Sequence, residues 1–158
     1  MSASWGNPTW TFFHTLADHI SDSSFDIVGK ELINVIERIC RHLPCPECTE
    51  HATIFWGRVN KQSIKTSQDL RNILFMFHNI VNKRKHKPPF LKENLTQYNH
   101  INIVLAYKNF LNKFHTNGNM SLISNAFHRT RMLAHLKIWF NSNLHHFINR
   151  KIETDIEV

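Results

Sequence analysis

Two of the three cysteines in this chain, Cys45 and Cys48, are separated by Pro-Glu in the segment LPCPEC. This spacing suits a dithiol–disulfide exchange centre, in which one cysteine is exposed to attack and the other is placed to leave or to react onward. It also suits half of a zinc site, because Cys40 and His51 lie close enough in sequence to complete four ligands. A third possibility is a pair of unreactive cysteines in a packed helix.

The position of the pair relative to the expected helices favours exchange. Pro44 is expected to stop the preceding helix, which places Cys45 at the start of the next helix and Cys48 one turn inside it. Unpaired N–H groups and the helix dipole at such a start favour a thiolate. Cys40 follows Ile39 on the preceding helix and is expected to be a core residue, and a second pair of closely spaced metal ligands is missing.

A second group of polar residues lies in the otherwise apolar segment FMFHNIVNKRKHKPPF. His78 and Asn82 are one helical turn apart, and Asn79 lies beside them. Buried polar groups must be hydrogen-bonded, so this group needs internal partners or a ligand. The basic residues that follow, up to Lys87, would suit a phosphate.

Trp10 and His14 are also four residues apart and place an aromatic ring and an imidazole on one helix face. Together with the polar group of residues 78–82, they could line a flat aromatic ligand that carries a diphosphate. A flavin dinucleotide meets this description better than DNA does.

The elements that must position these residues are all expected to be helices. Asn7-Pro8 resembles an N-cap followed by proline at the first helical position, and Thr66 with Asp69 resembles a capping box. Apolar residues recur at helical spacing, and no internal repeat or convincing strand is found. The expected helices cover residues 7–20, 25–43, 45–59, 66–86, 104–114 and 122–152, with a linker over 115–121.

Length and composition set limits on the function. The chain has 158 residues, 42% of them hydrophobic, which is enough for one globular domain with an extension. No apolar run approaches the length of a membrane span, and the first residues do not resemble a signal peptide. The formal charge of +7 is spread along the chain apart from KRKHK at 83–87, so a solvated surface is preferred to a nucleic-acid site.

Three segments in this order, WGNPTWTFFHTLA, LPCPEC and FHNIVNKRKHKP, resemble the Erv/ALR family of FAD-linked sulfhydryl oxidases over about residues 5–90. The resemblance implies an all-α fold, a small bundle of four main helices plus a short fifth, here with a C-terminal helical extension. We therefore expect an FAD-binding bundle over residues 1–95 and an accessory helical segment over residues 96–158. The family commonly forms homodimers.

The resemblance also implies roles for individual residues. Cys45 would face substrate and Cys48 would face the flavin. Asn7 stands where the family often has Arg, so no role is carried over to it. The residues expected to bind FAD are Gly6, in the opening stretch, Trp10 and His14 at the flavin, His78, Asn79 and Asn82 at the adenine and ribose, and Lys83 and Lys87 near the adenosine and phosphates.

The implied activity is oxidation of protein dithiols, with electrons passing from Cys45–Cys48 through FAD to O₂ to give H₂O₂. The sequence has no second CxxC to act as a shuttle, so substrates would reach Cys45 directly or through a separate thioredoxin-like protein. Short family members occur in large DNA viruses, which suggests a viral source, virion proteins as substrates, and the host cytoplasm or virion as location. The competing hypotheses are a zinc-bound, basic nucleic-acid-binding module using Cys40, Cys45, Cys48 and His51, and a structural helical protein with inert cysteines.

Overall fold

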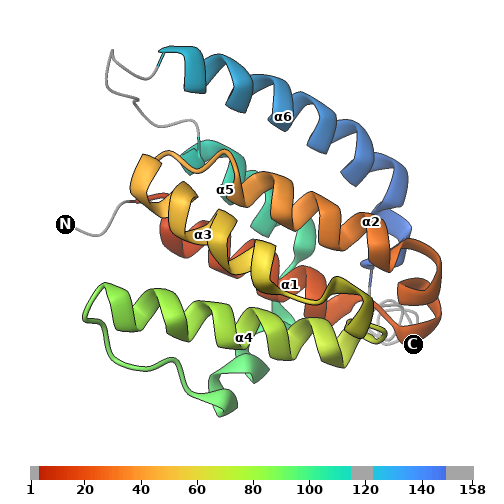
Figure 1. The fold of residues 1–158 in the computed structure, drawn as a ribbon. Coiled ribbons are helices and arrows are strands. Elements are labelled where there is room, and N and C mark those ends of the chain that lie inside the picture. Colours follow the sequence, from red (N-terminus) through yellow and green to blue (C-terminus); the bar gives the residue numbers. More distant parts are fainter. Residues whose placement is uncertain (1–3, 115–122, 149–158) are drawn as a thin grey trace.

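This computed structural model describes residues 4–114 and 123–148 of the chain (Figure 1). All regular secondary structure within these residues is helical. The predicted all-α fold is confirmed. No described helix is long and apolar enough to span a lipid bilayer. The helices are α1 (Gly6–His19), α2 (Asp22–Cys40), α3 (Pro46–Arg58), α4 (Ser67–Arg84), α5 (Ile103–Phe114) and α6 (Ile123–Asn143), with short 3-10 helices at η1 (Lys61–Ser63), η2 (Lys92–His100) and η4 (Leu144–His146).

Two helix starts differ from the prediction. The first helix begins at Gly6, with Trp5 at the N-cap position, so Asn7 lies inside the helix and is not its cap. The second begins at Asp22 rather than Phe25, because the Ser21 side chain accepts the backbone N–H of Ser24 at 3.1 Å and extends the helix toward its N-terminus.

The start of α4 agrees with the prediction. The Thr66 side chain accepts the N–H of Asp69, and the Asp69 carboxylate accepts the N–H of Thr66, each at 3.1 Å. This reciprocal capping box fixes where α4 begins and hence which of its residues face the bundle.

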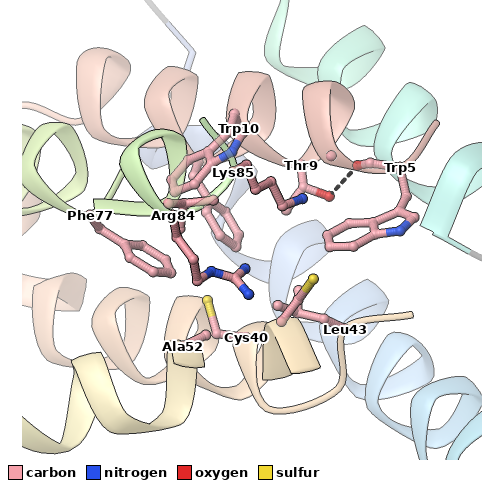
Figure 2. Close-up of a pocket in the computed structure, with 13 residues that line it drawn as sticks. Trp5, Thr9, Trp10, Cys40, Leu43, Ala52, Phe77, Arg84 and Lys85 are labelled. Atoms are coloured by element: carbon pink, nitrogen blue, oxygen red, sulfur yellow. Dashed lines mark hydrogen bonds between the residues drawn. The ribbon is translucent and has the colours of Figure 1, made fainter. Parts of the chain in front are cut away.

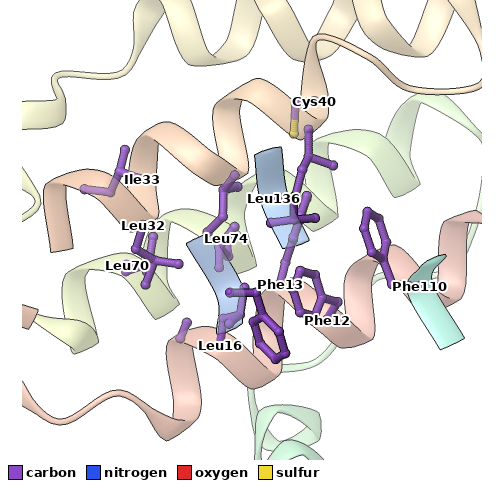
Figure 3. Close-up of a cluster of buried hydrophobic side chains, with 14 of the residues drawn as sticks. Phe12, Phe13, Leu16, Leu32, Ile33, Cys40, Leu70, Leu74, Phe110 and Leu136 are labelled. Carbon is purple, nitrogen blue, oxygen red and sulfur yellow. The ribbon is translucent and has the colours of Figure 1, made fainter. Parts of the chain in front are cut away.

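The hydrophobic core surrounds α1, which packs against α4, η2 and α5. Phe12 of α1 stacks on Phe110 of α5, with the ring centroids 5.0 Å apart. Figure 3 shows side chains from α1, α2, α4, α5 and α6 meeting in this core. Its fully or almost fully buried members include Phe12, Phe13, Leu16, Leu32, Ile33, Leu70, Leu74, Phe110 and Leu136.

The C-terminal helix α6 runs along α2 (Figure 1). Arg38 of α2 hydrogen-bonds His135 at 2.8 Å, and the Trp139 indole N–H donates to Glu31 Oε2 at 3.1 Å. Leu136 belongs to the same buried cluster as the residues of α1, α2 and α4. The described part of the predicted accessory segment therefore packs on the bundle through its core. The predicted linker, residues 115–121, lies outside the described residues.

Candidate active site

Cys45 and Cys48 form a disulfide at the start of α3, with their Cα atoms 5.2 Å apart. Cys45 occupies the N-cap position, and its Sγ accepts the backbone N–H of Cys48 at 3.2 Å. Cys45 is half-buried, whereas Cys48 is 8% exposed. The predicted placement of the pair is confirmed, although α2 already ends at Cys40, before Pro44. The more accessible sulfur is therefore the one at the helix start, where a thiolate is favoured.

Cys40 is a free thiol in the hydrophobic core, as expected. Burial raises the pKa of this thiol to about 12, which keeps it protonated and unreactive at neutral pH. Cys45 and Cys48 are bonded to each other, and the described residues contain no group of three His, Cys, Asp or Glu side chains arranged to hold a metal. This arrangement gives no support to the zinc set of Cys40, Cys45, Cys48 and His51.

A cavity, called here the inner cavity, lies beside Cys48 (Figure 2). Its walls are mostly apolar or aromatic, and two cationic side chains reach it from the end of α4. Figure 2 shows Arg84 and Lys85 facing the cavity across from Cys40 and Ala52. The lining includes Trp5, Trp10, Phe13, Cys40, Leu43, Cys48, Ala52, Phe77, Val81, Arg84 and Lys85.

The positive charges of Arg84 and Lys85 in the inner cavity are only partly balanced by other groups of the described residues. Arg84 donates from Nη1 to Glu47 Oε1 at 3.3 Å, but its Nε is buried and has no hydrogen-bond partner. Burial, followed by repulsion from Lys87 and Arg84, lowers the pKa of Lys85, whose Nζ lies 5.8 Å from the centre of the Trp5 ring. A buried N–H without an acceptor is costly, so this wall suits a ligand with acceptor or anionic groups.

A second cavity, the outer cavity, adjoins the first and shares Gly6, Trp10, Val81 and Lys85 with it. Its remaining wall is more polar. It is completed by Asn7, His78, Asn82, Lys87 and Pro88. The two cavities together form a continuous lining that runs from Cys48 to Lys87.

Two neutral histidines support the shared wall. The His78 ring stacks on Trp10, with centroids 4.1 Å apart and planes 3° from parallel, and its Nδ1 hydrogen-bonds His14 Nε2 at 2.9 Å. Burial and then repulsion from His78 lower the pKa of His14 to about 3. Burial and then repulsion from Lys87 lower the pKa of His78 to about 4. Both imidazoles are therefore neutral at pH 7, so one can donate while the other accepts.

Two asparagines near the end of α4, Asn79 and Asn82, hold the segment that follows the helix. Asn79 donates to the Phe90 carbonyl at 3.0 Å and accepts the Phe90 N–H at 2.7 Å. Asn82 donates to the Pro88 carbonyl at 3.3 Å. Asn79 therefore fixes the path of residues 85–90, whereas Asn82 also lines the outer cavity. Their predicted contacts with a cofactor stay predictions.

The fold brings most of the predicted site residues together. Gly6, Trp10, His78, Asn82 and Lys87 line the outer cavity, and Cys48 lines the inner one. His14 is buried behind Trp10 and His78 and stacks on both rings. Lys83 is exposed and lines neither cavity.

The sequence placed Arg84 and Lys85 among the basic residues that would suit a phosphate but did not assign them to the FAD-binding set, and they line the inner cavity whereas Lys83 does not. Helical spacing could have identified them, because Arg84 lies seven residues after Phe77, and Lys85 seven after His78. Lys83 is five residues beyond His78 and falls on another face of the helix.

Comparison with known proteins identifies relatives of this chain by sequence. The profile of the Erv1 / Alr family matches residues 7–103. The chain is 33% identical over 94 residues to a candidate FAD-linked sulfhydryl oxidase of Invertebrate iridescent virus 3, covering 59% of this chain and 64% of that protein, which is less than two thirds of its length. It is 34% identical over 83 residues to the FAD-linked sulfhydryl oxidase of African swine fever virus, covering 52% and 69% of the two chains. No solved structure gives a significant match.

Proposed function

The chain belongs to the Erv1 / Alr family, and from this premise we propose that it is an FAD-dependent thiol oxidase that forms disulfide bonds in protein substrates. The observation that carries the proposal is the Cys45–Cys48 disulfide, whose half-buried sulfur lies at a helix start while the other lines the inner cavity. The names of the viral relatives add the cofactor and the thiol substrate.

The residues of the two joined cavities fit FAD. Trp10, Phe77 and Cys48 would contact the ring system, and the buried Nε of Arg84 would donate to its polar edge. Asn82 and Lys87 would contact the nucleotide part through the outer cavity. Gly6, His14, His78 and Asn79 complete the proposed set, of which His14 and Asn79 act by positioning their neighbours. Lys83 is included on the family resemblance alone, because it lines neither cavity. Bound FAD supplies a two-electron acceptor that O₂ can reoxidise.

The exchange chemistry is carried by the two cysteines. A substrate thiolate attacks Cys45 Sγ, which breaks the Cys45–Cys48 bond and leaves Cys48 as the thiolate. The second substrate thiolate then attacks the mixed disulfide, so the substrate leaves oxidised and the cysteine pair is reduced by two electrons. The N–H of Cys48 and the helix dipole stabilise the Cys45 thiolate as it leaves, and the walls of the inner cavity exclude water around Cys48.

The same proposal includes the electron acceptor, the route by which electrons arrive, the source of the protein and its oligomeric state. The acceptor is O₂, the product is H₂O₂, and electrons reach Cys45 directly from substrate or through a thioredoxin-like relay protein. The viral relatives support a viral source, with virion proteins as substrates in the host cytoplasm. We also propose a homodimer, as is common in the family.

Absorbance spectra of two cysteine variants test the proposed roles. The purified protein should be yellow and release about one FAD per chain. C45S leaves Cys48 as an unpaired thiolate beside the ring, so we expect a long-wavelength charge-transfer band at neutral pH and loss of dithiol oxidation. C48S should also be inactive but should lack the band, because Cys45 does not line the inner cavity.

The control for both variants is flavin content, which should remain that of the parent protein. A band in C48S and none in C45S would reverse the two roles. A colourless protein that releases zinc on denaturation would replace this proposal with the metal-binding one.

A further inference from the structure

A third cavity, called here the basic cavity, opens against a different face of the first turn of α3. The face that bears Cys48 and Ala52 turns toward the inner cavity, whereas Pro46 and Thr49 line the basic cavity. Leu43 lines both. The half-buried Cys45 does not line this cavity but directly precedes the lining residue Pro46 in the chain.

The opposite wall comes from α6. His128 and Arg129 line the cavity together with Arg41 and His42 from the end of α2. None of the described residues that line it is acidic. The family profile ends at residue 103, so this wall is built by a part of the chain that lies beyond the matched region.

Arg129 is the most unusual residue of this wall, because its side chain is charged but the residue is only 4% exposed. Its Nε donates to the His42 carbonyl at 3.0 Å, and burial lowers its pKa. Within residues 4–114 and 123–148 no carboxylate forms an ion pair with it. A guanidinium stays protonated at neutral pH, and a buried one without a carboxylate is unfavourable unless a ligand supplies the anion.

The neighbouring charges do not neutralise the cavity. Arg41 Nη2 bonds Glu37 Oε1 at 2.7 Å, but the other oxygen of Glu37 bonds Lys61 at 2.7 Å, so one carboxylate serves two cations. The side chain of Arg41 is 56% exposed and can turn toward a ligand. His128 is exposed as well.

We propose that the basic cavity binds an acidic stretch of the substrate protein next to its reactive cysteine pair, so that α6 takes part in substrate selection. The inference rests on the proposed thiol oxidase function. A substrate carboxylate in the cavity would balance the charge of Arg129 through a charge-assisted hydrogen bond. It would also hold the neighbouring thiol of the substrate beside Cys45. A protein is favoured over a nucleic acid because the cavity is lined by Leu43 and Pro46, which flank the segment of Cys45, the residue that must meet a protein thiol.

Binding can be measured without turnover. The probe is a fluorescent peptide in which Ser replaces both cysteines of the substrate pair and four Asp or Glu residues flank them. The matched peptide is identical except that Gln replaces each acidic residue. Fluorescence anisotropy at low salt should give roughly tenfold tighter binding of the acidic peptide. R129Q, and separately R41Q at an exposed position, should remove most of this difference.

Lys137→Gln is the matched control, since it removes the same charge from an exposed position of α6 that does not line the cavity. It should bind the acidic peptide as the parent protein does. Circular dichroism of R129Q and R41Q establishes that each is folded, and R41Q keeps the test decisive if R129Q unfolds. Equal binding of the two peptides by the parent protein would overturn the proposal.

Turnover separates this proposal from the function on which it rests. With dithiol forms of the two peptides, the ratio of kcat/KM for the acidic peptide to that for dithiothreitol should fall about fivefold or more in R41Q. Failure of the parent protein to oxidise dithiothreitol would reject the oxidase function, whereas the anisotropy result would still decide the docking site. An oligothymidylate of equal charge that binds more tightly than the acidic peptide and depends on Arg129 would overturn the proposal in favour of a nucleic-acid site.

Discussion

Cys40 and Cys48 line the same cavity but differ in bonding and in the ease of forming a thiolate. Cys48 is held at the first turn of α3 by its disulfide to Cys45, whereas Cys40 is 1% exposed at the end of α2. At the scale of single residues, chemistry in this cavity is therefore decided by location relative to a helix start and by burial, rather than by the presence of sulfur.

Cys40 is predicted to be dispensable for turnover. C40S should keep dithiol-dependent oxygen consumption, because a thiol with a pKa of about 12 supplies no thiolate at neutral pH. It should lose about 1–3 kcal/mol of unfolding free energy in urea, since a hydroxyl would replace a thiol in the core. C40A is the control for the polar effect. Loss of activity with fold and flavin retained would make Cys40 a resolving thiol or a metal ligand.

The His14–His78 pair predicts a loss of stability on acidification. Both folded-state pKa values, about 3 and about 4, lie below the ordinary value of 6.5, so the unfolded chain binds protons first as the pH falls. Below pH 6.5 the unfolding free energy of the flavin-free protein should therefore fall with pH, by about one kcal/mol or more per pH unit, until His78 itself protonates near pH 4 and His14 near pH 3 in the folded protein.

Urea unfolding of the flavin-free protein at pH 7, 6 and 5 measures this slope. An unfolding free energy that stays constant over this range would show that the two imidazoles are not held neutral in the folded protein.

At the scale of elements, the capped start of α4 determines which residues further along this helix line the two cavities. Its capping box sets the start at Ser67, and three further turns bring Phe77, His78 and Val81 to the cavity walls. The amides of Asn79 and Asn82 then hold the segment that leaves the helix. This one helix therefore supplies part of the lining of both cavities and also holds in place the segment that follows it.

Replacing two residues of α4 should weaken flavin binding. H78A/N82A removes the ring stacked on Trp10 and the amide that bonds the Pro88 carbonyl, so the outer cavity loses a wall and a polar contact. We expect flavin content per chain to fall well below that of the parent protein, as measured by absorbance after denaturation.

Two lysine variants provide the comparison on the same helix end. K85A should lower flavin content, because Lys85 lines both cavities, and K83A should change it less, because Lys83 lines neither. Full flavin retention in H78A/N82A would reject this placement of the cofactor.

At the scale of the whole molecule, α5 and α6 share one buried cluster with α1, α2 and α4. Tyr107 and Phe110 of α5 pack against Phe12, and Phe140 of α6 stacks on Tyr107. The C-terminal helices should therefore unfold together with the bundle, in a single transition.

A truncation in α6 tests this coupling. L136A should lower the unfolding free energy by about 2–5 kcal/mol, because it leaves a cavity at a residue that is 4% exposed. I138A, two residues along the same helix and 67% exposed, should change it by no more than about 0.5 kcal/mol. Circular dichroism and tryptophan fluorescence should give one midpoint. Two separated transitions in L136A would show that residues 96–158 form an independent unit.

The sequence by itself determined the helices and the identity of the reactive pair. Apolar spacing, the Thr66–Asp69 box and Pro-Glu between Cys45 and Cys48 are local signals, and local hydrogen bonds and helix periodicity are sufficient to interpret them. They also placed Cys40 in the core, since it follows an apolar stripe. The boundaries were less accurate: the starts of α1 and α2 were misplaced, α2 ends at Cys40 rather than at residue 43, and α6 ends at Asn143 rather than at residue 152.

The tertiary structure decided which cations face the site and which side chains of α6 meet the chain after α2. Lys83, Arg84 and Lys85 are adjacent in sequence and chemically similar, and the rotation of α4 about its axis selects the last two for the inner cavity. The meeting of Arg129 with His42, 87 positions apart, depends on how α6 packs along α2. Helix rotation and long-range packing are set by the sum of many side-chain contacts across the core, which no short stretch of sequence contains.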